Sequence, residues 1–202
     1  MIIYGDVISP FVRMALVTAH EVGLADKVSR EPARVAPTEA NKALEAHSPL
    51  ARIPVLVTDH GHAIHDSRVI MEYLCHVAGD KVLLPDDGVK RFRILTLQAI
   101  GQGLADTAVA YRYEHAFRPA GKQWPEWAAR QRERMDAVFD HLNASWMADL
   151  DHVSAGTICV AAALGYIEFR LPDVKWRDNR AALATWHANF SNRPAMTATK
   201  LA

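Results

Sequence analysis

The stretch IIYGDVISPFVRMALVTAHEVG, residues 2–23, predicts a strand, a turn and a helix in succession. Ile2 to Tyr4 form a short β-type run, and Gly5-Asp6 breaks it. Ser9-Pro10 then begins a helix, because Ser is a preferred N-cap and Pro at the first helical position loses no needed N–H. Gly23 lies where such a helix ends. The Ser9 hydroxyl is therefore expected at the positive end of a helix, which favours an anion, although capping alone also explains a serine there.

The composition describes a chain without a strong charge preference. Of the 202 residues half are hydrophobic, and 23 basic residues balance 23 acidic ones. This balance argues against a nucleic acid or an anionic membrane as partner. The most apolar run, residues 158–167, has about half of the ~20 residues that a membrane span needs, and no signal pattern is present. Cys75 and Cys159 fit buried free thiols in a reducing compartment, so we expect a cytoplasmic protein.

The rest of the first third continues to alternate strands and helices. In chain order, we expect a weak strand at 27–31, a short helix at 38–46, paired strands at 53–58 and 62–65, and a helix starting at Asp66-Ser67. The apolar face of the last helix is predicted from the spacing of Val69, Ile70, Tyr73, Leu74 and Val77. This order predicts a small mixed sheet covered by helices.

Three features of this region could hold a ligand. Ser9 occupies the strand-to-helix turn where thioredoxin-type redox proteins have a Cys-x-x-Cys motif, so any sulfur chemistry here needs a thiol brought in from outside. Ile53-Pro54 begins a strand; a trans bond is the usual form, whereas a cis bond would turn the Ile53 backbone toward an extended peptide. Asp66-Ser67 caps a helix whose free N–H groups could bind a carboxylate, while Asp66 could pair with an ammonium group.

The order and spacing of these motifs resemble the cytosolic glutathione S-transferases, especially small bacterial members with a serine at the helix start. The matching segments are SPFVR at 9–13, RIPVLV at 52–57, HDSRVIMEYL at 65–74, LLP at 83–85, LGYIEFR at 164–170 and NRP at 192–194. The resemblance implies an α+β N-terminal thioredoxin-like domain followed by an all-α helical-bundle domain. On this basis we expect a glutathione-binding domain at 1–78, a linker at 79–88 and a helical domain at 89–202.

The resemblance also implies roles for single residues. Ser9 would donate a hydrogen bond to the glutathione sulfur and hold it as a thiolate. Ile53, before a cis Pro54, would pair its backbone with the cysteinyl residue of glutathione. Asp66 and Ser67 would hold the γ-glutamyl ammonium and carboxylate groups. Arg52 stands where relatives often have Gln or Lys and could reach a carboxylate, whereas Tyr4 is interpreted as a packing residue.

From Val89 the pattern is helical almost to the end of the chain, with breaks near 118–119, 150–153 and 171–172. Gly101 and Gly103 lie inside the first long helix, where a bend or a close neighbour would explain a glycine. The resemblance implies a second-substrate pocket lined by aromatic residues, namely Phe11, Tyr111, Tyr113 and Phe117. Each of these rings could equally be core.

The remaining candidates concern stability and metal binding. The helix starting at Ser154 is apolar nearly all round and should be buried, with Thr157 replacing the acidic residue usual in its capping box. His60, His62 and His65 cluster near a predicted turn, but no thiol or carboxylate completes a metal site, so we expect none.

The resemblance implies a detoxifying enzyme, a glutathione transferase that joins the glutathione thiolate to small hydrophobic electrophiles or uses it to reduce a peroxide. It implies a homodimer that uses glutathione as co-substrate and needs no other cofactor. Two alternatives remain open. The first is a non-catalytic member that binds glutathione or hydrophobic ligands, or acts as a scaffold. The second, a disulfide reductase, is disfavoured because that chemistry usually needs a cysteine at the position of Ser9.

Overall fold

The computed structural model describes residues 1–201 as two compact units. The N-terminal unit comprises Met1–Phe92 together with the segment from Arg193 on, and the helical unit comprises Arg93–Asn192. The sequence predicted an N-terminal domain at 1–78 and a helical domain at 89–202. The compact units differ from those ranges chiefly in assigning the last segment to the N-terminal unit.

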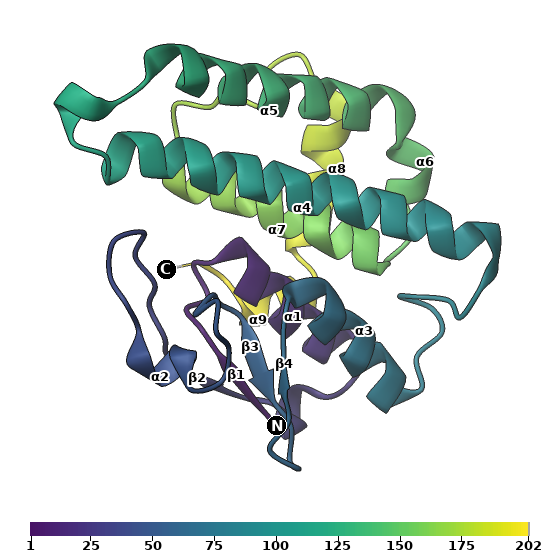
Figure 1. The fold of residues 1–202 in the computed structure, drawn as a ribbon. Helices are drawn as coiled ribbons and strands as arrows, with labels where there is room; N and C mark the ends of the chain where they lie inside the picture. The colour runs from purple at the N-terminus through teal and green to yellow at the C-terminus, as the bar shows by residue number, and fades with distance from the viewer. Residues whose placement is uncertain (202) are drawn as a thin grey trace. The chain divides into compact units, whose positions relative to one another are not determined.

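The elements follow the predicted alternation (Figure 1). The strands are β1 (Ile2–Tyr4), β2 (Ser29–Glu31), β3 (Val55–Val57) and β4 (Ala63–Ile64). The helices of the N-terminal unit are α1 (Pro10–Glu21), the 3-10 turn η1 (Ala25–Lys27), α2 (Lys42–Glu45), α3 (Ser67–Ala78) and α9 (Pro194–Ala198). Those that follow are α4 (Gly88–Ala116), η2 (Ala120–Lys122), α5 (Pro125–Ser145), α6 (Met147–Leu150), α7 (Ala155–Arg170) and α8 (Ala181–Ser191).

The four strands form one mixed sheet in the order β2-β1-β3-β4. β1 runs parallel to β2 and antiparallel to β3, and β3 pairs with β4 as the predicted hairpin. One core cluster joins the sheet to both flanking helices, and it includes Ile3, Leu56, Val12, Ala15, Ile70 and Leu74. Because α1 and α3 bury residues in the same cluster, they cover the same face of the sheet. This is the thioredoxin-like arrangement that the sequence predicted.

The predicted apolar face of α3 was partly wrong. Ile70 and Leu74 are fully buried as expected, but Val69 is 51% exposed and Val77 is 44% exposed. Met71 is fully buried in their place, next to Ile70 on the helix. The predicted helix at 38–46 is also shorter, because α2 begins only at Lys42, where Asn41 caps it. The position of the sheet and α1 decides which face of α3 is buried, whereas a local cap sets the start of α2.

Polar contacts hold the last segment against α1. The buried Arg13 guanidinium donates to the Met196 carbonyl oxygen at 3.2 Å and to Thr199 Oγ1 at 3.5 Å. Arg193 forms two 2.8 Å hydrogen bonds with the Glu21 carboxylate near the end of α1. These contacts explain why the chain after α8 groups with the N-terminal unit, although it follows the helices in sequence.

In the helical unit α7 is the central element, as predicted. Its residues from Ala155 to Leu164 are all buried. Ser154 caps the helix: its Oγ accepts from the Thr157 N–H at 3.2 Å, and Thr157 Oγ1 accepts from the Ser154 N–H at 2.8 Å. The predicted capping box with threonine in place of an acid is therefore confirmed.

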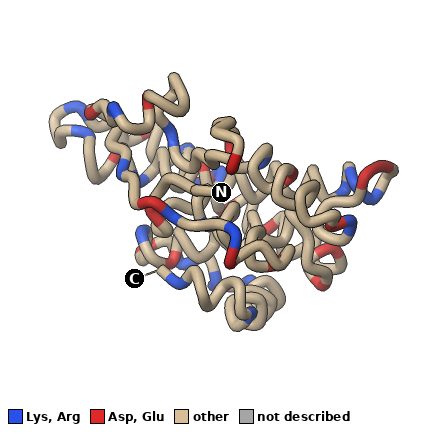
Figure 2. The backbone as a smooth tube through the Cα atoms, turned by 90° about the horizontal axis from the view of Figure 1, so that it is seen from below, with Lys and Arg blue, Asp and Glu red and all other residues tan. Residues whose placement is uncertain are grey.

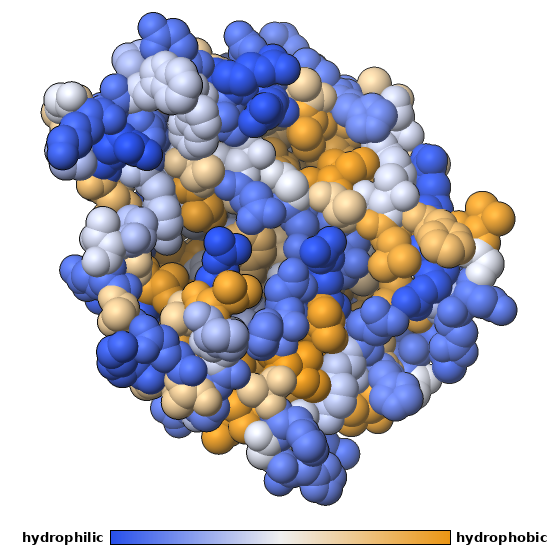
Figure 3. Space-filling model, in the orientation of Figure 1, coloured by the Kyte–Doolittle hydropathy of each residue, from blue (hydrophilic) through white to orange (hydrophobic). Residues whose placement is uncertain are grey.

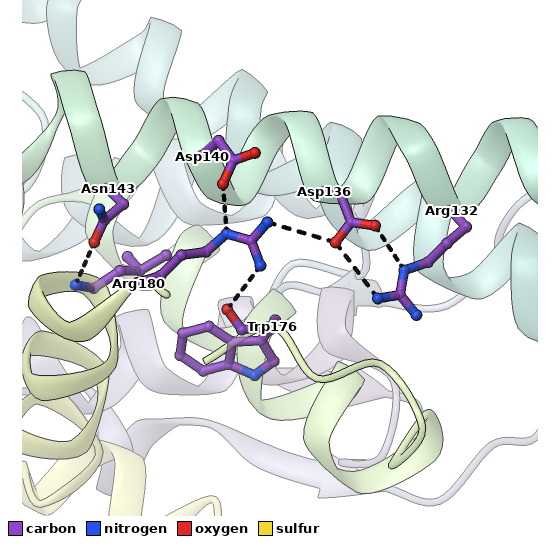
Figure 4. A network of polar contacts seen from close by, with 7 residues as sticks. Arg132, Asp136, Asp140, Asn143, Trp176 and Arg180 are labelled. Atoms are coloured by element: carbon purple, nitrogen blue, oxygen red, sulfur yellow. Dashed lines mark hydrogen bonds and ion pairs between the residues drawn. The ribbon is translucent and has the colours of Figure 1, made fainter. Parts of the chain in front are cut away.

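A network of charges joins α5 to the segment before α8 (Figure 4). Arg180 donates to Asp140 on α5 at 2.7 Å and lies 3.6 Å from Asp136. The same guanidinium donates to the Trp176 carbonyl oxygen at 3.2 Å. Asn143 extends the network by accepting from the backbone of α8 at 3.1 Å. Arg180 thus has acceptors on two segments and orders the irregular chain between α7 and α8.

The carboxylate of Glu114 on α4 binds two residues of the loop between α4 and α5. It accepts from the Trp124 N–H at 2.6 Å and from Arg118 Nε at 2.6 Å, and its side chain is only 5% exposed. The Trp124 hydrogen bond first, and the Arg118 guanidinium second, lower the pKa of Glu114 below its ordinary value of 4.5. Because the folded protein binds this proton less tightly than the unfolded chain, the stabilisation is present above pH 4.5 and is lost as the pH falls through the lowered pKa.

We therefore expect the stability difference between the wild type and Glu114→Gln to depend on pH. Gln keeps an acceptor for the Trp124 N–H but removes the charge, so the variant should be less stable at neutral pH. The difference should shrink as the pH falls below 4.5. Urea unfolding at several pH values measures it, and a difference independent of pH would contradict the assignment of the charge.

The surface alternates in both charge and hydropathy. Figure 2 shows basic and acidic residues interspersed along the backbone, in keeping with the balanced net charge. On the face drawn in Figure 3, hydrophobic patches alternate with hydrophilic regions. Within residues 1–201, no helix combines the length and hydropathy needed to cross a membrane.

Candidate active site

The predicted serine lies at the start of α1. Ser9 is the N-cap residue, with extended backbone angles, and its Oγ accepts from the Val12 N–H at 3.5 Å. Pro10 follows at the first helical position, as the sequence predicted. Because the hydroxyl acts as acceptor toward Val12, its own proton remains available for donation. The half-buried Ser9 can therefore cap its helix and donate to an anion at the same time.

The turn before Ser9 is held by Asp6. Asp6 Oδ1 accepts from the Ile8 N–H at 3.0 Å, and the Asp6 carbonyl oxygen accepts from the Ser9 N–H at 2.9 Å. The sequence predicts Asp6 only as a strand breaker. An Asp that accepts from the N–H two residues on is the pattern of an Asx turn, and that pattern could have identified it. Asp6 therefore orients the backbone that leads into Ser9.

Gly5 allows this turn to lie close to Ile53, which precedes Pro54 in the second predicted ligand-binding feature. Its φ of +150° is rare for other residues, and a Cβ there would lie 2.4 Å from Val12 Cγ2 and 3.3 Å from Ile53 Cβ. The segment before Ser9 thus approaches Ile53 closely. The Ile53-Pro54 bond is cis, which is the form that the resemblance implied. Among the described residues no hydrogen bond to the Ile53 backbone is recorded, so its N–H and C=O are available to a ligand.

The third feature lies at the start of α3. Asp66 is the N-cap residue; its Oδ1 accepts from the Arg68 N–H at 3.0 Å, and its Oδ2 lies 3.4 Å from Arg68 Nη2. Ser67, the first residue of the helix, is only 2% exposed, whereas Asp66 and Arg52 are exposed. The predicted capping by Asp66 is confirmed. The predicted roles of Arg52, Asp66 and Ser67 toward a ligand stay predictions.

The protein's own thiols are poorly suited to nucleophilic chemistry. Both cysteines are buried and free, as predicted. Burial, with smaller contributions from Asp80 and Glu72, raises the pKa of Cys75 to about 12, so its thiol is protonated at neutral pH. No group of three metal-ligating side chains occurs within residues 1–201, His60, His62 and His65 included.

The comparisons with known proteins agree with this geometry. Residues 8–77 match a family model described as "Glutathione S-transferase, N-terminal domain". The chain is 30% identical to the uncharacterized GST-like protein YibF of Escherichia coli (strain K12), over 99% of this chain and 98% of the relative. The chain belongs to the glutathione S-transferase family.

Solved structures of relatives in this family contain glutathione or a conjugate of it. A glutathione transferase family member from Pseudomonas fluorescens Pf-5 with bound glutathione superimposes with a TM-score of 0.97 at 38% identity. That comparison covers 100% of this chain and 98% of the relative. A structure with bound S-(propanoic acid)-glutathione gives 0.92 at 36% identity, with 100% of each chain covered.

The residues predicted to line a second-substrate pocket fall into two groups. Phe11 is half-buried in the first turn of α1, in the N-terminal unit. The other three belong to the helical unit, at or just beyond the end of α4. Tyr113 and Phe117 pack edge to face, with ring centroids 5.0 Å apart, and Tyr111 packs on His115 at 4.5 Å. The structure thus brings Tyr113 and Phe117 together, and the pocket itself stays a prediction.

Proposed function

We propose that this glutathione S-transferase binds glutathione and joins its thiolate to small hydrophobic electrophiles. The observation that carries the proposal is the Ser9 hydroxyl, which keeps a proton to donate at the N-terminus of α1. The cis Ile53-Pro54 bond, the free Ile53 backbone and the cap of α3 at Asp66-Ser67 support it, because they match the peptide, carboxylate and ammonium groups of glutathione. Glutathione bound to the Pseudomonas fluorescens relative supports it further.

The proposed chemistry uses the sulfur of glutathione and not a cysteine of the protein. A free thiol has a pKa near 8.5, so a decrease of about two units would make it mostly thiolate at neutral pH. That decrease corresponds to roughly 2.7 kcal/mol, within reach of a charge-assisted hydrogen bond from Ser9 plus the helix dipole. With an aryl halide, the sulfur forms a C–S bond at the carbon that carries the halogen, and halide leaves. No cofactor besides glutathione is needed for this step, and a peroxide is a second class of acceptor.

Binding and turnover test the proposal separately. Calorimetric titration with glutathione should show one site per chain, and 1-chloro-2,4-dinitrobenzene with glutathione should release chloride faster than in the absence of protein. Retention on immobilised glutathione with no turnover of a panel of electrophiles would favour the non-catalytic alternative. Absence of glutathione binding would contradict both the transferase proposal and the non-catalytic glutathione-binding alternative.

We also propose that the protein is a homodimer. The N-terminal unit exposes large apolar side chains, which are expected to be covered by a partner. They are Leu50, Val69, Val77, Val82, Val89 and Phe92. Sedimentation should give the mass of two chains, and Phe92→Asp should shift it toward one, because Phe92 is 69% exposed in the single chain. A monomeric wild-type protein would contradict this proposal.

A further inference from the structure

Two arginines of the helical unit have no carboxylate or amide acceptor among the described residues, whereas all its other arginines have one. Seven of the nine arginines in residues 93–192 donate to a carboxylate or an amide side chain, namely Arg93, Arg118, Arg130, Arg132, Arg134, Arg177 and Arg180. Within residues 1–201, no such acceptor is recorded for Arg112 or Arg170, although both are half-buried. A partly desolvated guanidinium group without an anion is unfavourable, so these two need an explanation.

The packing of α4 on α7 brings the two arginines to one place. A Cβ on Gly101 of α4 would lie 2.6 Å from the Val160 backbone nitrogen and 2.8 Å from Cys159 Cβ. A Cβ on Gly156 of α7 would lie 2.8 Å from Leu97 Cβ. Because Leu97 faces Gly156 and Gly101 faces Val160, the two helices run side by side in the same direction (Figure 1).

The same register continues to the ends of both helices. Arg112 follows Gly101 by eleven residues, and Arg170 follows Cys159 by eleven. Eleven residues are about three helical turns, so both arginines return to the faces on which α4 and α7 meet. Their guanidinium groups are therefore expected at the same end of this helix pair.

The charges of both arginines act on Tyr166. It lies one turn before Arg170 on α7 and is only 4% exposed. Arg112 donates a hydrogen bond to its hydroxyl, and the charges of Arg112 and Arg170 both lower the pKa of that hydroxyl. Burial raises the pKa of Tyr166 to about 12 against the opposing effect of the two arginines, so at neutral pH the hydroxyl is a neutral donor. Among the described residues no carboxylate contributes to this environment.

The surroundings of the two guanidinium groups are aromatic. Arg112 lies 5.4 Å from the centroid of the Phe117 ring, and Arg170 lies 4.9 Å from that of Phe169. Tyr113 packs edge to face on Phe117 at 5.0 Å. Two guanidinium groups and a hydroxyl can donate hydrogen bonds to a carboxylate. The neighbouring aromatic rings can pack against an apolar group attached to that carboxylate.

We propose that Arg112, Arg170 and Tyr166 of the helical unit bind the carboxylate of small aromatic or aliphatic acids. The use of such acids as electrophiles rests on the proposed glutathione transferase activity, whereas the anion site itself does not depend on turnover. Its neighbours Tyr113 and Phe117 are two of the residues expected to line the second-substrate pocket.

Binding tests the anion site without catalysis. In calorimetric titrations without glutathione, 4-chloro-3-nitrobenzoate should bind the wild-type protein about tenfold or more tightly than its methyl ester, the size expected for a hydrogen bond to a charged group. Arg112→Gln and Arg170→Gln should each abolish this preference, and Tyr166→Phe should weaken it. Arg134→Gln is the matched control, since Arg134 is exposed and donates only to Gln131 at 3.1 Å, and it should leave the preference unchanged. Equal binding of acid and ester by the wild type would overturn the proposal.

Turnover and stability separate the remaining outcomes. With glutathione present, kcat/KM for the acid should fall about tenfold or more in Arg112→Gln, while that for the ester should stay within about twofold. Preferential binding of the acid with no turnover of either compound would contradict the transferase proposal and leave the anion site intact. The thermal midpoint of Arg112→Gln should stay close to that of the wild type, because among the described residues Arg112 has no carboxylate to lose and its hydrogen bond is to the neutral Tyr166 hydroxyl. A large decrease in that midpoint, with the acid preference retained, would assign Arg112 a structural role and overturn the proposal.

Discussion

Replacing Ser9 by alanine should lower kcat about 10- to 100-fold at neutral pH, while the Kd for glutathione changes by less than about threefold. This range follows from the loss of one hydrogen bond to a charged group, about 1.5–3 kcal/mol. Without that donor the pKa of the bound thiol rises, and a smaller fraction of glutathione is thiolate. The contacts proposed for Ile53, Asp66 and Ser67 are untouched, which is why affinity should persist.

The pH dependence of the rate separates this chemical role from a structural one. In Ser9→Ala, the rate should recover as the pH rises toward the ordinary thiol pKa, because the glutathione thiol then ionises without a hydrogen bond from Ser9. The substitution also removes the cap of α1, where Ser9 accepts from the Val12 N–H, and should lower the free energy of unfolding by about 1 kcal/mol.

Ser9→Thr is the matched control for the serine, because it keeps both the hydroxyl and the cap. It should retain most of the activity. Unchanged kcat in Ser9→Ala would remove the hydroxyl from the mechanism. A loss of kcat that is independent of pH would point instead to a displaced helix start.

Replacing Gly101 by alanine should lower the free energy of unfolding by roughly 2–3 kcal/mol, although alanine is the better helix former. The new Cβ would lie 2.6 Å from the Val160 nitrogen and 2.7 Å from the Cys159 carbonyl carbon. These are backbone atoms of α7, the buried central helix, so the contact can be relieved only by moving one helix away from the other. The midpoint of urea unfolding, followed by far-UV circular dichroism, measures the effect.

Gly103 provides an internal control on the same helix. A Cβ there meets nothing within 4 Å, and the residue is exposed. Gly103→Ala should therefore raise the free energy of unfolding by about 0.5–1 kcal/mol through helix propensity alone. If both substitutions changed the unfolding midpoint in the same direction, the close approach of α4 to α7 at Gly101 would be refuted.

Local features of the chain were predictable because they depend on a few neighbouring residues. The cap at Ser9, the hairpin between β3 and β4, and the box at Ser154 and Thr157 all follow from side chains within three or four positions of the backbone groups that they satisfy. The resemblance to the glutathione S-transferases, based on motifs spread over the chain, also held. The predicted ligand contacts of the site remain to be tested by experiment.

Features that depend on distant segments were predicted less well. Val69 and Val77 were expected on the buried face of α3, but that face is set by where the sheet and α1 lie, and Met71 and Cys75 are buried instead. The attachment of the last segment to α1 through Arg13 and Arg193 has no local pattern, because the partners are more than 170 residues apart.

The sequence by itself determined which turn presents Ser9, the residues that cap α1, α3 and α7, and the family to which the chain belongs. These depend on backbone hydrogen bonds that nearby side chains satisfy, and on motifs whose order is written in the chain. Only the tertiary structure decided that Gly101 is a contact point whereas Gly103 is not. It also decided that the charges of Arg112 and Arg170 both act on Tyr166, where no carboxylate among residues 1–201 contributes. The physical reason is that close packing and desolvation act between segments brought together by folding, and residue spacing along the chain does not specify them.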